Sequence, residues 1–227
     1  PGFSREGRLR WSSNRSGPFV IWRAEGDASG PRQVSDDGVD AENPTATPDG
    51  EWIVYGSGNP AHPGVYKRRL GGTETIRLVA GNVVLPETSP DGRFASFVAN
   101  WGTTEAALRV VRLADGALEP WAIPLHNDPG GIGIVAGRSR WLPDGSGIAY
   151  LTVAEDRTHG IVAQTFVPGQ PAAGAPRRLA GFDPDGATES FAFSPDGATI
   201  IVALWEQLSN ILVAENVAGI EPPRRRP

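Results

Sequence analysis

The chain has 227 residues, of which 39% are hydrophobic, and its formal net charge is −5. This hydrophobic content excludes an intrinsically disordered chain. The mild negative charge comes without a basic stripe, so we expect no nucleic-acid partner. The absence of cysteine excludes disulfides, thiolate metal ligands and cysteine nucleophiles. No apolar run reaches the roughly 18 residues that a membrane helix requires, so we expect no membrane insertion within the chain.

Five segments of the chain align on a turn glycine and define an internal repeat. They are Phe3–Gly7 (FSREG), Thr47–Gly50 (TPDG), Ser89–Gly92 (SPDG), Leu142–Gly145 (LPDG) and Ser194–Gly197 (SPDG). The glycines are spaced by 43, 42, 53 and 52 residues. Asp-Gly supplies the positive φ angles that a tight turn needs, and proline fixes φ just before it. The repeats so defined span residues 1–36, 37–80, 81–124, 125–180 and 181–223.

Short apolar strands follow each turn. The first set is predicted at Leu9–Ser12, Trp52–Tyr55, Phe94–Val98, Gly147–Val153 and Thr199–Trp205. The second set is predicted at Phe19–Arg23, Gly64–Arg68, Leu108–Leu113, Ile161–Phe166 and Ile211–Glu215, and short outer strands at Pro31–Ser35, Thr75–Ala80 and Pro176–Ala180. With an inner strand before each turn, every unit has four strands.

A unit of this size cannot bury both faces of its sheet alone, so neighbouring units must stack. We therefore predict an all-β fold, a β-propeller of four-stranded antiparallel blades with five repeats visible, in a single domain over residues 1–227. An ordinary β-sandwich with frequent turns is the alternative fold. The two long spacings place insertions at Pro124–Gly137, Ala154–Gly160 and Phe166–Pro176, and such insertions are expected in loops on one rim, often the binding rim.

Several motifs of the repeat resemble the TolB-type WD-like propeller family. They are Trp11–Gly17 (WSSNRSG), Ile21-Trp22, Arg32–Ser35 (RQVS), Asp40–Gly50 (DAENPTATPDG) and Arg177–Ala180 (RRLA). The last third is also similar to the C-terminal sensor propeller of bacterial membrane-anchored Ser/Thr kinases and winged-helix regulators, at Arg140–Leu151, Arg178–Asp183, Phe191–Gly197 and Ser209–Val217. The sequence departs from the family pattern at the degraded turn Ser4–Gly7 and at Ala80 and Ala180, where threonine is usual. The resemblance implies a bacterial, extracytoplasmic or periplasmic location.

The closure of the ring has two readings. The chain is either five blades of a six-bladed ring whose first blade lies upstream, or a five-bladed unit. Propellers of this type more often have six or more blades, which favours the first reading. The chain begins at Pro1 and has no methionine, so we expect it to be a processed or excised piece with any signal peptide, anchor or upstream domain outside it. The kinase-attached family ends near this point, which implies that the C-terminus is the natural one.

Three groups of residues contain side chains or glycines that could form metal or cofactor sites. His62, His126 and His159 lie far apart and lack a paired zinc-binding spacing. The acidic run 36–42 lacks the spacing of a calcium loop, and Asp40 fits better as a loop aspartate that accepts backbone hydrogen bonds. The glycines of segment 131–137 do not form a nucleotide-binding motif. We therefore predict no metal and no cofactor.

The glutamates of the inner strands are the strongest catalytic candidates. Glu42, Glu87 and Glu189 would approach the central channel of a propeller, where paired carboxylates could act in hydrolysis. They stand at unequal distances from their turn glycines, so we expect solvated or hydrogen-bonded carboxylates instead. The sequence contains no G-x-S-x-G nucleophile elbow and no kinase catalytic loop.

The leading functional prediction is a non-catalytic scaffold or sensor module. It would bind a protein, a peptide or a small ligand through the channel mouth and the loops opposite the Pro-Asp-Gly turns. Aromatic, arginine and amide side chains in loops often anchor interfaces, and on this basis the predicted binding residues are Asn100, Trp101, His126, Asn127, Asp128, Arg157 and His159. The alternatives are a hydrolase or lyase that uses the channel carboxylates, with or without calcium, and an accessory propeller of a larger enzyme.

Overall fold

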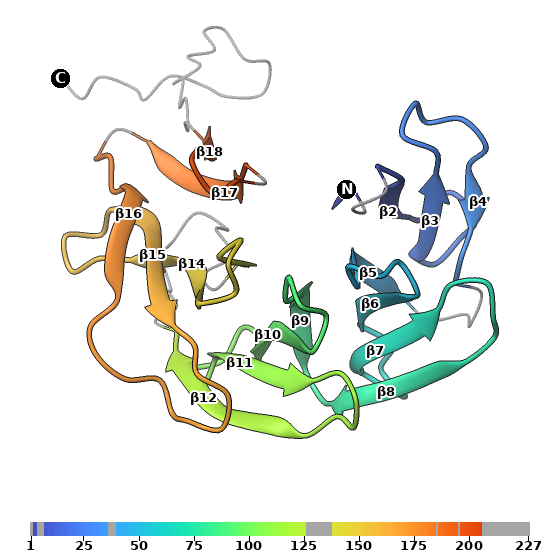
Figure 1. Cartoon of the computed structure of the whole chain (residues 1–227), viewed down its shortest axis with the longest axis horizontal. Helices are drawn as coiled ribbons and strands as arrows, with labels where there is room; N and C mark the ends of the chain where they lie inside the picture. The colour runs from blue at the N-terminus through green and yellow to red at the C-terminus, as the bar shows by residue number, and fades with distance from the viewer. Residues whose placement is uncertain are drawn as a thin grey trace, which may run out of the picture.

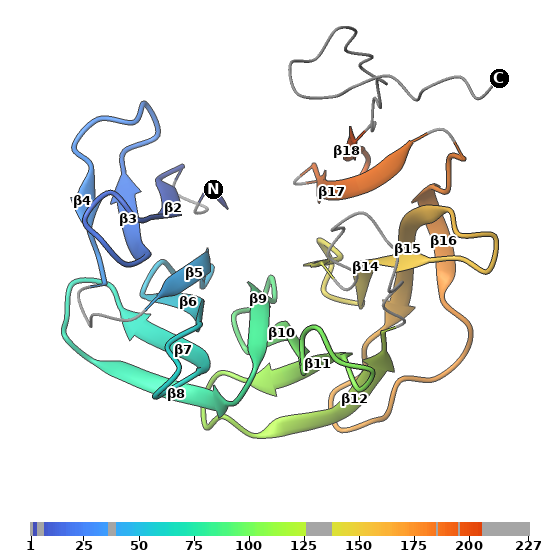
Figure 2. The same ribbon diagram turned by 180° about the vertical axis from the view of Figure 1, so that it is seen from behind.

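The computed structural model describes residues 2–3, 7–35, 40–125, 138–184, 186–194 and 196–205. These residues form five antiparallel sheets that follow one another along an open arc (Figure 1). The first and last sheets lie at the two ends of the arc, with the open side of the arc between them, as the view from behind also shows (Figure 2). The described ranges contain strands and turns and no helix, so no helix among them could cross a membrane.

Each sheet is built from strands that are consecutive in the chain and pair in sequence order. The first contains β1 (Gly2–Phe3), β2 (Leu9–Ser13), β3 (Val20–Ala24) and β4 (Arg32–Gln33), and the second β5 (Ala41–Ala46), β6 (Trp52–Ser57), β7 (Gly64–Arg69) and β8 (Thr75–Ala80). The third contains β9 (Val83–Thr88), β10 (Phe94–Ala99), β11 (Ala107–Arg112) and β12 (Leu118–Pro124). The fourth contains β13 (Ser139–Trp141), β14 (Gly147–Val153), β15 (His159–Thr165) and β16 (Arg177–Gly181), and the fifth β17 (Ala187–Phe193) and β18 (Ile200–Trp205).

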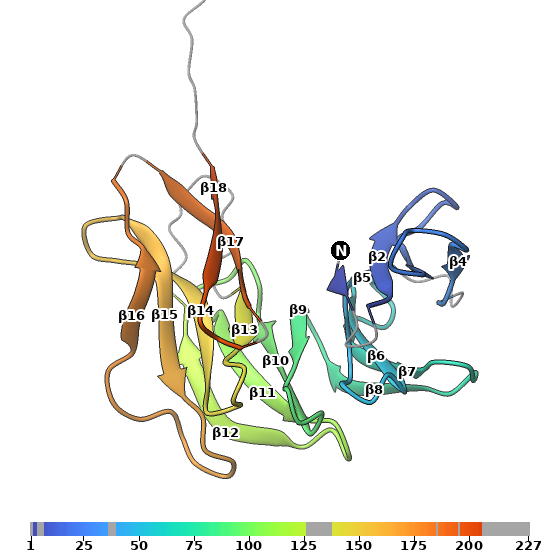
Figure 3. The same cartoon turned by 45° about the horizontal axis from the view of Figure 1, so that its top comes forward.

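The first strand of each complete sheet lies toward the middle of the arc and the last strand lies on its outside (Figure 1). The sheets also stand one after another in the tilted view of Figure 3. This arrangement confirms the predicted all-β fold with four-stranded antiparallel blades. The predicted strand Ile211–Glu215 lies outside the described residues.

The Pro-Asp-Gly turns are closed by their own side chains. In the turn before β10, the Ser89 hydroxyl donates to Asp91 Oδ1 (2.6 Å) and accepts a hydrogen bond from the Phe94 amide (3.0 Å). Asp91 Oδ1 also accepts from the Arg93 amide at 3.0 Å. Gly92 has a φ of 70°, in the left-handed region that glycine adopts without strain. The turn is therefore specified by a few neighbouring residues, which explains why its position could be predicted from the sequence.

The core lies between the sheets. Between the third and fourth sheets it is aromatic, because the Phe166 ring meets three others edge-on, those of Phe94, Trp121 and Trp141, at centroid distances of 5.1, 6.1 and 5.0 Å. Trp121 is fully buried at 0% exposure, and its indole Nε1 donates to the Thr165 carbonyl of the neighbouring sheet (2.9 Å). Each sheet is thus stabilised mainly by the face of the next one.

Buried hydroxyl groups join the inner parts of neighbouring sheets. Thr45 Oγ1 on β5 and Thr88 Oγ1 on β9 are 3.0 Å apart, and Ser96 Oγ on β10 and Ser139 Oγ on β13 are also 3.0 Å apart. Both pairs are separated by 43 residues in sequence. Pairing satisfies the polar atoms inside an otherwise apolar interface.

Candidate binding site

The alternating strand directions place the connections of each sheet on two opposite rims. The turns from the first to the second strand, and the connections from the third to the fourth, share one rim, which we call the Pro-Asp-Gly rim. The loops from the second to the third strand lie on the opposite rim. The fourth repeat's two insertions, Ala154–Gly160 and Phe166–Pro176, therefore lie on opposite rims, which corrects the expectation that such insertions share one rim.

A cavity of about 600 Å³ opens on the Pro-Asp-Gly rim, where the second, third and fourth sheets meet. We call it the rim groove, and the lining residues that matter for its chemistry are Trp52, Lys67, Arg93, Arg112, Leu113 and Glu119. Its volume is in the range of ligand-binding pockets, roughly 300–1,000 Å³. The sequence predictions did not include this groove, because its walls come from three separate repeats.

Lys67, the single lysine of the chain, lies in the wall of the rim groove. It is only 9% exposed, and its Nζ donates to the Leu113 carbonyl (2.6 Å) and lies 4.7 Å from the Trp52 ring centroid. No carboxylate of the described residues lies within the 4.0 Å of an ion pair with it. An ammonium group has three N–H donors, and burial of a charge is costly unless it is paired. Lys67 is therefore suited to receive an anionic group.

Glu119 secures the far side of the rim groove. Its side chain is 7% exposed, and Oε2 accepts a hydrogen bond from the Gly169 amide (2.6 Å), which belongs to the insertion after β15. Oε1 lies 3.8 Å from Arg112 Nη1. This contact holds the insertion of the fourth sheet against the third sheet, so the groove wall is preformed.

Two arginines stand at the edge of the rim groove. Arg112 is 45% exposed and its Nε donates to Asp115 Oδ1 (2.9 Å), while Arg93 is 67% exposed and its Nε donates to Asp91 Oδ2 (2.6 Å). The hydrogen bond to Asp115 raises the pKa of Arg112 above its usual value. A guanidinium has five N–H donors, more than either arginine uses in its hydrogen bonds to described residues, so each can bind a ligand without leaving its aspartate.

The described residues of the predicted binding surface lie on the opposite rim, and none of them lines the rim groove. Asn100 directly follows β10 and has a φ of 53°, and its carbonyl accepts from the Thr103 hydroxyl (2.9 Å), so its backbone shapes the loop. Trp101 is half-buried and packs against the core between the third and fourth sheets. His126, Asn127 and Asp128 lie outside the described residues.

Arg157 and His159 flank the end of the loop between β14 and β15. Arg157 is exposed and has a φ of 66°. His159 was expected in a loop, but it is the first residue of β15, paired with Val153, because the hairpin continues to that point. Its carbonyl accepts from the Phe182 amide (2.6 Å). Ligand binding by these residues stays a prediction.

Two of the three inner-strand glutamates interact with arginines. Glu87 Oε2 on β9 accepts from Arg140 Nη1 on β13 (3.1 Å). Burial raises the pKa of Glu87, and the charges of Arg140 and Arg10 oppose this rise. Glu42 is exposed on β5, and Glu189 on β17 interacts electrostatically with Arg138, whose pKa burial lowers. Within the described ranges no group of three or more His, Asp or Glu is close enough to hold a metal ion.

No family model matches the chain, and no curated protein matches it. Many solved structures are similar to it, among them the following three. TolB from Acinetobacter baumannii has a TM-score of 0.69 at 22% identity, covering 92% of this chain and 50% of that TolB. The putative TolB from Agrobacterium tumefaciens has a TM-score of 0.63 at 13% identity, covering 82% and 63% of the two chains, and a chain of the nidogen/laminin complex has 0.60 at 13%, covering 87% and 69%.

At these identities the likeness concerns the fold alone. The chain spans about half the length of the first TolB. Together with the antiparallel sheets in sequence order, the likeness shows that the chain has a TolB-like β-propeller fold.

Proposed function

We propose that the chain is a non-catalytic scaffold or sensor module that binds a segment of a partner protein in the rim groove. The observation that supports this most is Lys67, a buried cation at a ligand-sized groove with no carboxylate partner among the described residues. A carboxylate from the partner would neutralise Lys67, and Arg93 and Arg112 at the edge would accept a second acidic group. Charge-assisted hydrogen bonds of this kind are roughly twice as strong as neutral ones.

The similar solved structures support a protein partner. One of them is a chain from the complex of nidogen with laminin, and the fold is shared with TolB. The resemblance to sensor propellers of bacterial Ser/Thr kinases and winged-helix regulators fits the same role, with an extracytoplasmic location.

Peptide selection on the purified chain tests the proposal. A displayed random-peptide library is selected against the chain, and the affinities of the selected peptides are measured by fluorescence anisotropy. We expect peptides with Asp or Glu, whose affinity falls at least tenfold, about 1.4 kcal/mol, in Lys67→Met and also falls in Arg112→Ala. Arg112 is half-exposed, so its variant should fold even if Lys67→Met is destabilised.

Arg157→Ala is the matched control on the opposite rim. Peptides that bind Lys67→Met and Arg112→Ala as well as the wild type, but lose affinity for Arg157→Ala, would place binding at the loops predicted from the sequence. A selection that yields no acidic peptides would contradict the rim-groove proposal.

The second candidate function is a hydrolase or lyase that uses the channel carboxylates, alone or as part of a larger enzyme. Glu87 is the residue that supports this candidate, because a carboxyl group with a raised pKa can act as a general acid. The ion pair of Glu87 with Arg140 favours a structural role instead. Turnover of a panel of polysaccharides and peptides, lost in Glu87→Gln, would establish the enzyme in place of the binding module.

A further inference from the structure

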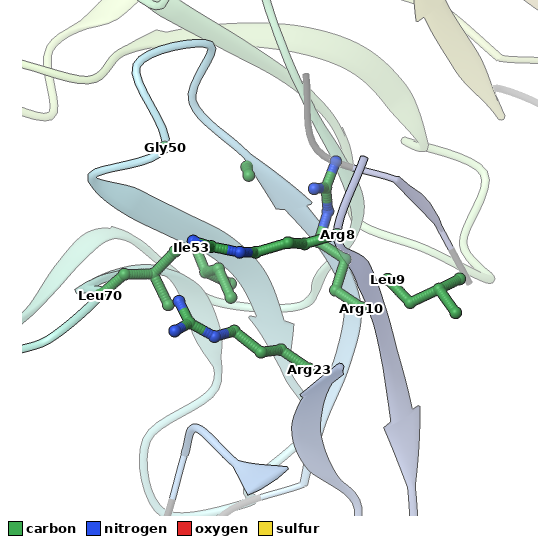
Figure 4. Close-up of a pocket in the computed structure, with 8 residues that line it drawn as sticks. Arg8, Leu9, Arg10, Arg23, Gly50, Ile53 and Leu70 are labelled. Carbon is green, nitrogen blue, oxygen red and sulfur yellow. The ribbon is translucent and has the colours of Figure 1, made fainter. Parts of the chain in front are cut away.

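A second cationic site lies between the first and second sheets (Figure 4). One wall is formed by Arg8, Arg10 and Arg23, from the region of β2 and β3, and the other includes Ile53 and Leu70 of the second sheet. We call this site the arginine crevice. The rim groove is lined by the second, third and fourth sheets, so the two sites share no lining residue.

Arg10 and Arg23 stand directly opposite each other in the pairing of β2 with β3. Side chains at such positions lie on the same face of the sheet, with Cβ atoms about 5 Å apart. Figure 4 shows both side chains extended toward Ile53 and Leu70, while Arg8 points in another direction. Like charges directly opposite each other on a sheet are unfavourable, so an anion beside Arg23 would relieve the repulsion.

The acidic residues near the arginine crevice do not neutralise Arg23. Glu25 pairs with Arg8, with its Oε2 3.4 Å from Arg8 Nε, at the exposed surface. Glu87 acts on Arg10, whose pKa is nonetheless lowered by burial. Arg23 forms no ion pair within the described part of the chain, and no Asp or Glu lines the crevice. One positive charge in this narrow space is therefore left for an external anion.

We propose that the arginine crevice binds a phosphate group between the guanidinium groups of Arg10 and Arg23. The planar fork of a guanidinium matches oxyanions through paired hydrogen bonds, and a tetrahedral phosphate has enough oxygens to accept from two forks at once. The cavity volume is about 20 Å³, so roughly one oxygen fits inside and the rest of the group stays at the mouth. Ile53 and Leu70 line the opposite wall, and an apolar wall lowers the local dielectric constant and strengthens the attraction.

The test uses inorganic phosphate as the probe, with the full chain, at constant ionic strength maintained by sodium chloride. Calorimetric titration and thermal melting are measured for the wild type, Arg23→Gln and the control Arg77→Gln, in which an exposed arginine of β8 is replaced. We expect phosphate to bind and stabilise the wild type and Arg77→Gln, and the affinity to fall at least tenfold in Arg23→Gln. Without phosphate, Arg23→Gln should melt no lower than the wild type, because the substitution relieves the repulsion.

Two further measurements identify which site binds the phosphate and whether the phosphate is a free anion or part of a phosphorylated partner. An affinity for phosphate that falls in Lys67→Met but not in Arg23→Gln would place the anion in the rim groove and overturn the proposal. Tighter binding of O-phosphoserine than of inorganic phosphate would identify a phosphorylated partner, whereas the reverse order would identify the free anion. Absence of phosphate binding in the wild type, or equal binding by Arg23→Gln, would also overturn it.

Discussion

Trp121 joins the third sheet to the fourth, and its replacement measures how much this interface stabilises the fold. The side chain is fully buried on β12, its indole N–H donates to the Thr165 carbonyl at 2.9 Å, and its ring meets Phe166 edge-on at 6.1 Å. Trp121→Ala removes the ring packing and the hydrogen bond together. Trp121→Phe keeps most of the apolar ring and removes the N–H donor.

The expected costs follow from these contacts. Truncation of a buried tryptophan to alanine lowers the free energy of unfolding by about 3–5 kcal/mol. In Trp121→Phe the Thr165 carbonyl loses its indole donor in a part-buried place, which costs about 0.5–1.5 kcal/mol. In a chain of this size each 1 kcal/mol lowers the melting temperature by about 2–4 °C. Trp121→Ala should therefore lower it by roughly 6–20 °C.

Urea denaturation followed by far-UV circular dichroism measures both variants. Leu118→Ala is the control, because Leu118 lies on the same strand and is 45% exposed, and it should change the free energy of unfolding by less than about 0.5 kcal/mol. A loss of under about 1 kcal/mol in Trp121→Ala would refute the view that this interface is a main source of stability. So would a loss in Leu118→Ala as large as that in Trp121→Ala.

Three other predictions concern the turns and the channel. Gly145 has a φ of 74° and free space around an added Cβ. Gly145→Ala should therefore lower the free energy of unfolding in urea by about 1–2 kcal/mol from backbone strain alone, and Gly145→Asn should lower it less. Equal losses in the two variants would contradict this. Burial alone would raise the pKa of Asp91, but hydrogen bonds from Ser89 and Arg93 hold it below its usual value. The melting temperature should therefore fall as pH drops below about 4, and Asp91→Asn should flatten that decline. The effect of pH on stability has the opposite sign for Glu87, because burial raises its pKa. Its contribution to the free energy of unfolding is full below about pH 4.3 and is lost as the pH rises through the raised pKa, a change that Glu87→Gln should abolish.

Local chemistry explains why the strands and turns could be predicted from the sequence. The turn Ser89–Gly92 is closed by hydrogen bonds among Ser89, Asp91 and the next few residues, and glycine is needed at its end. The strand predicted at Phe94–Val98 is observed at Phe94–Ala99 because its apolar residues alternate between two buried faces. Such features depend on a few neighbouring residues and need no knowledge of the ring.

The rim groove depends on contacts between distant repeats and could not be located in the same way. Glu119 meets Gly169 from 50 residues away, and Lys67 reaches the carbonyl of Leu113 across 46 residues. The one available signal was Lys67, the single lysine of the chain, inside the strand predicted at Gly64–Arg68. The extent of β15 back to His159 is likewise set by its pairing with Val153.

The contacts between sheets join neighbours in chain order, as the buried hydroxyl pairs Thr45–Thr88 and Ser96–Ser139 do. In such an array, cooperativity is transmitted from one unit to the next, and a local destabilisation fades with distance along the chain. The third sheet has an ordered neighbour on both sides, whereas each end sheet has one within the described residues. Amide protons of β10 and β11 should consequently be the slowest to exchange with solvent, and unfolding should begin by fraying at the two ends of the arc.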